Sequence, residues 1–255
     1  MGPGHIGEAA HGEHGRRVMI SYEHVTKRFG ATTAVEDVTF RIDQGECVAF
    51  LGPNGAGKTT LVRLLLDFTR PTAGAITVRG IASTDIAARA GIGYLPEIVR
   101  LPPRLTVRRY LMRCARIIGV PTGRAADLCH HAVEQAGMGG KEDVLLGACS
   151  KGMAQRVALA AALLGEPRMV ILDEPTAGLD PIGMREVRLM LEALKKDGVT
   201  ILLNSHLLSE VERVCDSALI IHRGCLLVKG AIASIVQQGE TLEDLFVRLV
   251  KAGPS

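Results

Sequence analysis

The sequence predicts an α/β fold built on a parallel sheet with helices on both faces. Beyond residue 168, short apolar runs alternate with helical segments, as they do in successive βαβ units. The apolar run Cys47–Leu51 enters a glycine-rich turn that a helical segment follows, which is the order of a phosphate-binding loop. From Pro96 the chain becomes mainly helical, which predicts a separate helical part between these two regions.

The glycine-rich turn fits the pattern G-x-x-x-x-G-K-[ST] at every fixed position. Its glycines let successive N–H groups point at phosphate oxygens, and the helix N-terminus adds partial positive charge. Lys58 is expected to reach the β- and γ-phosphates, and the Thr59 hydroxyl to bind Mg²⁺. A turn that binds nothing is disfavoured because both flanks fit as well. The residues expected to contact nucleotide here are Gly52, Pro53, Asn54, Gly55, Ala56, Gly57, Lys58, Thr59 and Thr60.

The N-terminal part is predicted to be a mobile tail followed by strands. Residues 1–17 are rich in Gly, His and Glu and show no apolar period. The irregular spacing of His5, His11 and His14 disfavours a metal site in this tail. A turn is expected at Phe29-Gly30, and the expected strands are Val18–Tyr22, Val38–Ile42, Glu46–Leu51, Ala75–Gly80 and Ile92–Leu95.

Helices are expected from Pro96 to about residue 164. Thr106 is the predicted N-cap of the first, which Gly119 and Pro121 end. The expected helices are Val107–Ile118, Ala125–Ala136 and a third from Ser150 to Leu164. The elements expected after them are strand Met169–Asp173, helix Ile182–Lys196, strand Val199–Leu203, helix Leu207–Val214, strand Ala218–Ile221 and a short helix opening at Thr241.

Composition excludes several classes of function. Aromatic residues make up 3% of the chain and Trp is absent, so a stacking platform for single-stranded nucleic acid is not expected. The net charge of +3 is too small to indicate a nucleic-acid partner. The six cysteines contain no C-x-x-C pair and are typical of reduced cysteines in a cytosolic protein. No apolar stretch approaches the roughly 20 residues of a membrane span, and no signal peptide is expected.

Two carboxylates follow the apolar strand Met169–Asp173. Asp173 ends the strand, where ligands bind in open α/β sheets, and is placed to hold Mg²⁺. Glu174 comes next and is the candidate general base for an attacking water. The alternative is that both carboxylates only cap the following turn, which the phosphate loop upstream disfavours.

A third motif makes the interpretation specific. Cys149-Ser150-Lys151-Gly152-Met153-Ala154-Gln155-Arg156 precedes an Ala/Leu-rich helix, and the chain resembles the nucleotide-binding subunit of an ABC (ATP-binding cassette) transporter. In that family a Ser-x-Gly signature at a helix start recognises ATP held by the opposite subunit. Ser150 and Gly152 match the signature, whereas Cys149, Lys151 and Met153 depart from its commonest form. The variant resembles the subfamily that works with exporter-type membrane subunits.

The resemblance extends to four further positions. Asp180, in Gly178-Leu179-Asp180, matches the loop that contacts the partner subunit and the nucleotide site. His206 matches the switch histidine that senses the γ-phosphate, and Phe29 the aromatic that stacks on adenine. Glu97 stands where the family usually carries a Gln that touches Mg²⁺. A carboxylate still ligates Mg²⁺ but, unlike an amide, cannot donate a hydrogen bond to water.

The resemblance implies a RecA-like P-loop NTPase core with an N-terminal antiparallel β subdomain and an inserted α-helical subdomain. The cassette is expected over 18–230, its helical subdomain over about 97–155 and a C-terminal helical tail over 231–255. ATP and Mg²⁺ are the implied cofactors. The implied partners are a second ATP-binding subunit, in a homo- or heterodimer, and integral membrane permease subunits. The expected location is cytoplasmic, peripheral on the inner face of the cell membrane, and the expected work is transport, with export favoured.

Two features of the helical part carry their own hypotheses. Its arginines are expected to form a basic face toward lipid headgroups or the membrane subunit, or else a solvated face. They are Arg100, Arg104, Arg108, Arg109, Arg113, Arg116 and Arg124. Cys149 precedes a helix N-terminus, a position that predicts a lowered thiol pKa and shielding by ATP.

Three other classes of protein are alternatives to a transporter subunit. A DNA-repair ATPase of the SMC type needs a long coiled-coil insert, but only 91 residues separate Lys58 from Ser150, with no sustained heptads. A soluble cassette ATPase in assembly or translation stays open, although the ribosomal kind normally carries two cassettes. A non-catalytic scaffold is disfavoured because Lys58, Asp173 and Glu174 are all present.

Overall fold

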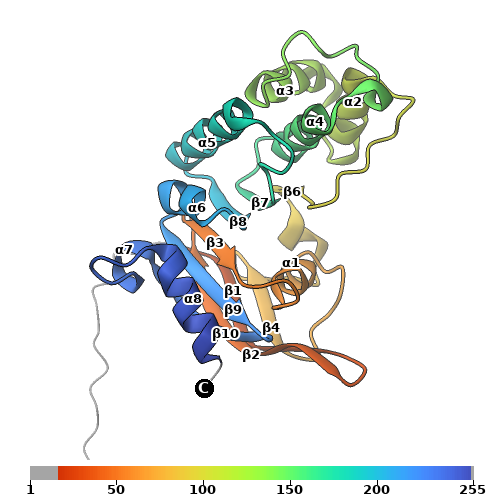
Figure 1. Cartoon of the computed structure of the whole chain (residues 1–255). Coiled ribbons are helices and arrows are strands. Elements are labelled where there is room, and N and C mark those ends of the chain that lie inside the picture. Colours follow the sequence, from red (N-terminus) through yellow and green to blue (C-terminus); the bar gives the residue numbers. More distant parts are fainter. Residues whose placement is uncertain (1–16, 254–255) are drawn as a thin grey trace, which may run out of the picture.

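Two β-sheets and a group of helices make up the protein (Figure 1). The computed structural model describes residues 17–253. The three tail histidines, and all of the predicted tail except residue 17, lie outside the described residues. The strands are β1 (Val18–Phe29), β2 (Thr32–Asp43), β3 (Cys47–Leu51), β4 (Ala73–Val78), β5 (Ile81–Ala82), β6 (Ile92–Leu95), β7 (Met169–Asp173), β8 (Thr200–Asn204), β9 (Ser217–His222) and β10 (Cys225–Ala231). The helices are α1 (Lys58–Leu65), α2 (Val107–Ile117), α3 (Thr122–Gln135), α4 (Lys151–Leu163), α5 (Pro181–Lys196), α6 (Leu208–Val214), α7 (Ile232–Ile235) and α8 (Leu242–Ala252).

The core sheet has the strand order β10-β9-β3-β8-β7-β6. All pairs are parallel except β9–β10, which forms an antiparallel edge. Every residue of β3, β7 and β8 is buried, as expected for apolar strands covered on both faces. One face packs on α1 and the second sheet, and the other packs on α4, α5, α6 and α8. The predicted α/β fold is confirmed.

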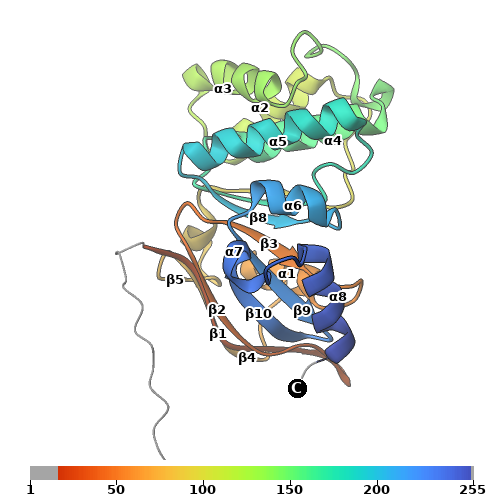
Figure 2. The ribbon, with the colours of Figure 1, turned by 60° about the vertical axis from the view of Figure 1, so that its left-hand side comes forward.

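The second sheet is antiparallel, with the order β2-β1-β4-β5, and covers α1 from the far side (Figure 2). The hairpin β1–β2 turns at Gly30, as predicted, but both strands are longer than the sequence suggested. The added residues, 23–29 and 32–37, are mostly polar and partly exposed, so they lack an apolar signal. Ladder hydrogen bonds between β1 and β2, rather than burial, hold them in the sheet.

Helices α2 and α3 gather at one end of the molecule (Figure 1). Together with one side of α4 they enclose a separate apolar cluster, which includes Val107, Leu111, Val133 and Leu164. Another side of α4, with Leu159 and Leu163, belongs to the core-sheet cluster. Helix α4 therefore contacts both parts of the chain. The predicted N-cap Thr106 is present at the start of α2, and Ser150 caps α4. No helix between residues 17 and 253 has the length and hydropathy that crossing a bilayer requires.

Candidate functional site

The phosphate loop lies between the end of β3 and the first turn of α1. Gly57 precedes α1 with φ near 114°, in the region that favours glycine, and a Cβ there would lie 2.7 Å from the carbonyl oxygen of Ala34. The Ala56 carbonyl accepts from the N–H of Gly224, in the turn between β9 and β10. Two neighbouring segments thus fix the loop so that its N–H groups and the α1 N-terminus face one cleft.

That cleft has a volume of about 330 Å³ and brings most of the predicted residues together. Glu97 enters it from the segment after β6, and Asp173 and Glu174 enter it from the end of β7. The lining residues are Ala34, Asn54, Gly55, Ala56, Gly57, Lys58, Thr59, Thr60, Glu97, Asp173, Glu174 and Asn204. Gly52 and Pro53 lie just behind, where their carbonyl oxygens accept from Nζ of Lys58.

Asp173 is almost fully buried at the carboxyl end of β7. Burial raises the pKa of its carboxyl, and the nearby carboxylates of Glu97 and Glu174 add to the increase. Nδ2 of Asn204 donates to Oδ1 of Asp173 and opposes this increase, as does Lys58. Burial in turn lowers the pKa of Lys58, while the three carboxylates act in the opposite direction.

The backbone of Glu174 is held on both sides. Its φ of 51° lies in the left-handed region that non-glycine residues rarely occupy. Its N–H donates to the Asn204 carbonyl at 2.8 Å, and its own carbonyl accepts from Nε2 of Gln155 and from the N–H of Ala177, both at 3.0 Å. Gln155 is a buried residue of α4. These three contacts keep an uncommon backbone conformation that directs the Glu174 side chain toward the cleft.

His206, the predicted switch histidine, lies beside the Glu174 carboxylate. Its Nδ1 is 2.8 Å from Oε2 of Glu174, although the two groups are not aligned for a hydrogen bond. His206 lines a second cavity of about 800 Å³ that adjoins the cleft and shares Lys58, Glu97 and Glu174 with it. Lys151 also lines this cavity, together with Glu174 of the same chain.

Phe29, Ser150, Gly152 and Asp180 line neither the cleft nor the cavity beside it. Phe29 is half exposed at the tip of the β1–β2 hairpin, with Nζ of Lys27 4.8 Å from its ring centroid. Ser150 caps α4 by accepting from the N–H of Met153, and Asp180 caps α5 by accepting from the N–H of Gly183. Gly152 packs against Gly178 and Leu179, so the signature and the loop before α5 lie together on the surface of one chain.

The cleft suits a divalent cation as well as phosphate. Three carboxylates, from Glu97, Asp173 and Glu174, lie around one half-buried ammonium group, that of Lys58. Oδ1 of Asn204 is buried there without a hydrogen-bond partner. Such a set of oxygen donors fits Mg²⁺, which prefers carboxylate, hydroxyl and water ligands.

Two hypotheses about the helical part change. Cys149 precedes the N-cap Ser150, and burial raises the pKa of its thiol, so the expectation of a lowered pKa is wrong. Its Sγ contacts the Leu145 carbonyl at 3.6 Å. The basic face is partly neutralised, because Arg108 pairs with Asp143 at 3.2 Å and Arg124 with Glu166 at 3.5 Å.

Sequence reasoning missed Asn204 and Gln155. Asn204 carried a usable signal, since it ends an apolar strand at the same sheet edge as Asp173. Gln155 gave a weaker one, as a polar residue inside an Ala-rich helix whose burial becomes evident only once α4 packs on the core sheet.

Comparison with known proteins gives consistent matches. The family model described as "ABC transporter" matches residues 35–177. Nod factor export ATP-binding protein I of Burkholderia lata is 38% identical over 220 residues, which are 86% of this chain and 72% of that protein. The protein of the same name from Rhizobium sp. (strain N33) is 36% identical over 224 residues, covering 87% and 74%.

Solved structures agree with these matches. A structure described as the ATP binding subunit of an ABC transporter superimposes with a TM-score of 0.84 at 32% identity, covering 91% of this chain and 99% of that one. The structure of cbiO1 from Clostridium perfringens, described as part of the ABC transporter complex cbiONQ, gives a TM-score of 0.76 at 28% identity, covering 84% and 89%.

Proposed function

Because the chain belongs to the ATP-binding subunits of ABC transporters, we propose that its own residues hydrolyse ATP in a dimer that powers export through separate membrane subunits. The observation that supports the catalytic part most directly is the fixed backbone of Glu174. The contacts from Asn204 and Gln155 hold its carboxylate beside the phosphate loop and 2.8 Å from His206.

The residues of the cleft divide the work. Backbone N–H groups of the phosphate loop and Lys58 bind the phosphates and stabilise the charge that develops on the γ-phosphoryl group. Glu174 accepts a proton from the attacking water, which contributes about 10²–10⁴ in rate for such a group. His206 holds the Glu174 carboxylate and donates to a γ-phosphate oxygen. Asn204 orients Asp173 through its amide.

Thr59, Glu97 and Asp173 are the residues that would hold Mg²⁺. When bound, the ion would neutralise negative charge on the phosphates. Glu97 in place of the usual Gln adds a third carboxylate to the cleft. Its added negative charge favours the cation and opposes the γ-phosphate, so it is expected to change the Mg²⁺ dependence more than the chemistry.

A second subunit completes the site in this proposal. Ser150 and Gly152 lie at the N-terminus of α4, outside the chain's own cleft, on a surface shared with the loop that ends at Asp180. A hydroxyl, free N–H groups and a helix N-terminus form a suitable anion site for ATP held by the partner. Phe29, half exposed at the tip of the β1–β2 hairpin, is then available to stack on adenine.

The membrane partner is proposed to dock between the core sheet and the helical part. A groove of about 830 Å³ opens there, with Ile86, Tyr94, Ile117 and Arg100 among its lining residues. Exposed apolar and basic side chains at one groove suit an amphipathic segment of a membrane protein. Such docking would place the chain on the cytoplasmic face of the membrane. Export is proposed because the relatives of known name are Nod factor export proteins.

The test compares wild type with Glu174→Gln. The variant is expected to lose ATP turnover, retain nucleotide binding and accumulate as an ATP-dependent dimer in light scattering. Glu243→Gln, an exposed change at the start of α8, is the matched control and should hydrolyse ATP at the wild-type rate. A fully active Glu174→Gln would refute the base assignment. Recovery of a polytopic membrane protein with the tagged chain tests the transport partner separately.

A further inference from the structure

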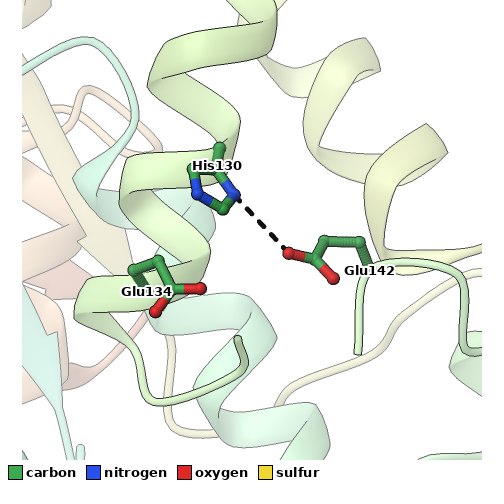
Figure 3. Close-up of side chains that lie close together, drawn as sticks. All are labelled: His130, Glu134 and Glu142. Atoms are coloured by element: carbon green, nitrogen blue, oxygen red, sulfur yellow. Dashed lines mark ion pairs between the residues drawn. The ribbon is translucent and has the colours of Figure 1, made fainter. Parts of the chain in front are cut away.

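A group of metal-binding side chains lies on the helical part of the chain, outside both cavities at the nucleotide site. His130 and Glu134 are one turn apart on α3, and Glu142 faces them from the segment that follows (Figure 3). A ring nitrogen and two carboxylate oxygens lie within 4.8 Å of one another. Nδ1 of His130 is 3.6 Å from Oε1 of Glu142. None of these three residues lines the phosphate cleft or the cavity beside it.

The position of Glu142 is fixed by the start of α2. Its carbonyl accepts from the N–H of Arg108 at 2.8 Å, and the carbonyl of Val144 accepts from the N–H of Val107 at 3.0 Å. These N–H groups belong to the first turn of α2, where backbone N–H groups have no acceptor within their own helix. The Glu142 side chain is only 13% exposed, so the fold presents its carboxylate in one place.

The carboxylate of Glu134 occupies space that a glycine leaves open. A Cβ added at Gly139 would come inside van der Waals contact with both carboxylate oxygens of Glu134. Gly139 therefore allows Glu134 to lie toward Glu142 instead of being pushed outward. His130 and Glu134 are themselves exposed, so small rotations can bring their donor atoms closer together.

The site lacks a positive charge that its surroundings favour. Helix α3 ends at Gln135 with no basic residue in its last turn, and Glu134 adds a negative charge to the negative end of the helix dipole. Across residues 17–253, neither Glu134 nor Glu142 forms an ion pair with a lysine or arginine. Arg108 pairs instead with Asp143. A bound cation would offset the negative charges of Glu134 and Glu142 and the negative end of the α3 dipole.

We propose that His130, Glu134 and Glu142 form a Zn²⁺ site. One imidazole and two carboxylates, with water in the fourth position, match the tetrahedral N/O coordination of this ion. The imidazole ligand discriminates against Mg²⁺ and Ca²⁺, which take oxygen ligands. The bound ion joins the end of α3 to the segment that leads to the signature residue Ser150, so it stabilises the helical part of the chain.

The experiment titrates Zn²⁺ into the full chain by calorimetry in a background of millimolar Mg²⁺. His5, His11 and His14 are replaced by Asn in every sample, so that the tail histidines cannot contribute to the measured Zn²⁺ binding. His130→Asn and Glu142→Gln remove proposed ligands. His131→Asn is the matched control, since it changes the same residue type one position along α3, outside the group. Melting temperatures with and without Zn²⁺ are measured for each protein.

One Zn²⁺ is expected per chain, with a rise in melting temperature. Each ligand variant should weaken binding by at least the roughly 10- to 100-fold that even outer-shell changes cost, and should lose the thermal shift. Gly139→Ala should weaken binding while every ligand is retained. Equal Zn²⁺ affinity in wild type, His130→Asn and Glu142→Gln would overturn the proposal. So would an equal loss in His131→Asn, which would place the ion elsewhere.

Discussion

Replacing Gln155 with Leu removes one of the two donors to the carbonyl of Glu174. The side chains are similar in size, but Leu leaves this carbonyl with the N–H of Ala177 as its remaining donor. Glu174 then has less support for its backbone φ of 51°, and its carboxylate is held less firmly beside the phosphate loop. The phosphate loop itself is untouched, so nucleotide affinity is expected to remain near the wild-type value.

The magnitude follows from the net contribution of one hydrogen bond, about 0.5–1.5 kcal/mol. If this whole contribution acts on the conformation that places Glu174, kcat decreases by roughly 2- to 13-fold at 1.36 kcal/mol per tenfold change. KM for ATP should change little. Gln135→Leu makes the same substitution at an exposed position on α3, and it should leave both constants unchanged.

A double-mutant cycle separates positioning from general damage. Gln155→Leu is measured in the wild-type and in the Glu174→Gln background, using residual hydrolysis in single-turnover assays. If Gln155 acts through Glu174, it should have almost no further effect once the carboxylate is gone. A decrease by the same factor in both backgrounds would refute the reasoning, because it would show that Gln155 contributes independently of the base.

Four further substitutions probe other contacts. Gly93→Ala should destabilise the fold by about 1–3 kcal/mol or more in chemical denaturation, because a Cβ on β6 would overlap the Ala162 carbonyl of α4. Gly123→Ala, which has open space, should instead stabilise it by about 0.4–1 kcal/mol. Glu97→Gln should remain active but need more Mg²⁺ for half-maximal hydrolysis, and an unchanged Mg²⁺ titration would contradict its role as a ligand. Asp173→Asn should raise the melting temperature at pH 7 in EDTA while abolishing hydrolysis. Burial raises the pKa of this carboxyl, so its ionised form lowers stability above that pKa. The difference should disappear below pH about 3.9, where Asp173 is protonated in both folded and unfolded chains.

Strands of the core sheet with an apolar run were predictable to within one residue. The bounds of β6 and β7 match the predictions, and β8 lies one residue further along the chain than predicted. Burial of β7 and β8 on both faces requires such an apolar run. The hairpin β1–β2 was underestimated because its outer half is polar and held by backbone pairing. The edge strand β10 was missed for a related reason, since its residues are only partly buried and show no contrast between faces.

The site was predictable where one short segment carries the whole signal. Lys58, Asp173 and Glu174 each follow or precede a strand within a recognisable motif, and the structure brings them to one cleft. Gln155 was not predictable in this way. Its partner is 19 positions along the chain, and only the packing of α4 against the core sheet brings the two together.

Helix α4 combines three roles that explain its composition. It begins at Ser150, the residue proposed to bind the partner's nucleotide, and five residues later Gln155 holds the backbone of Glu174. Its small alanines allow close approach to β6, where Gly93 meets the Ala162 carbonyl. Helix α4 therefore links Ser150 to the backbone of Glu174 through Gln155. In the proposed dimer, one helix would contact the partner's nucleotide at its start and support the proposed base of its own chain through Gln155.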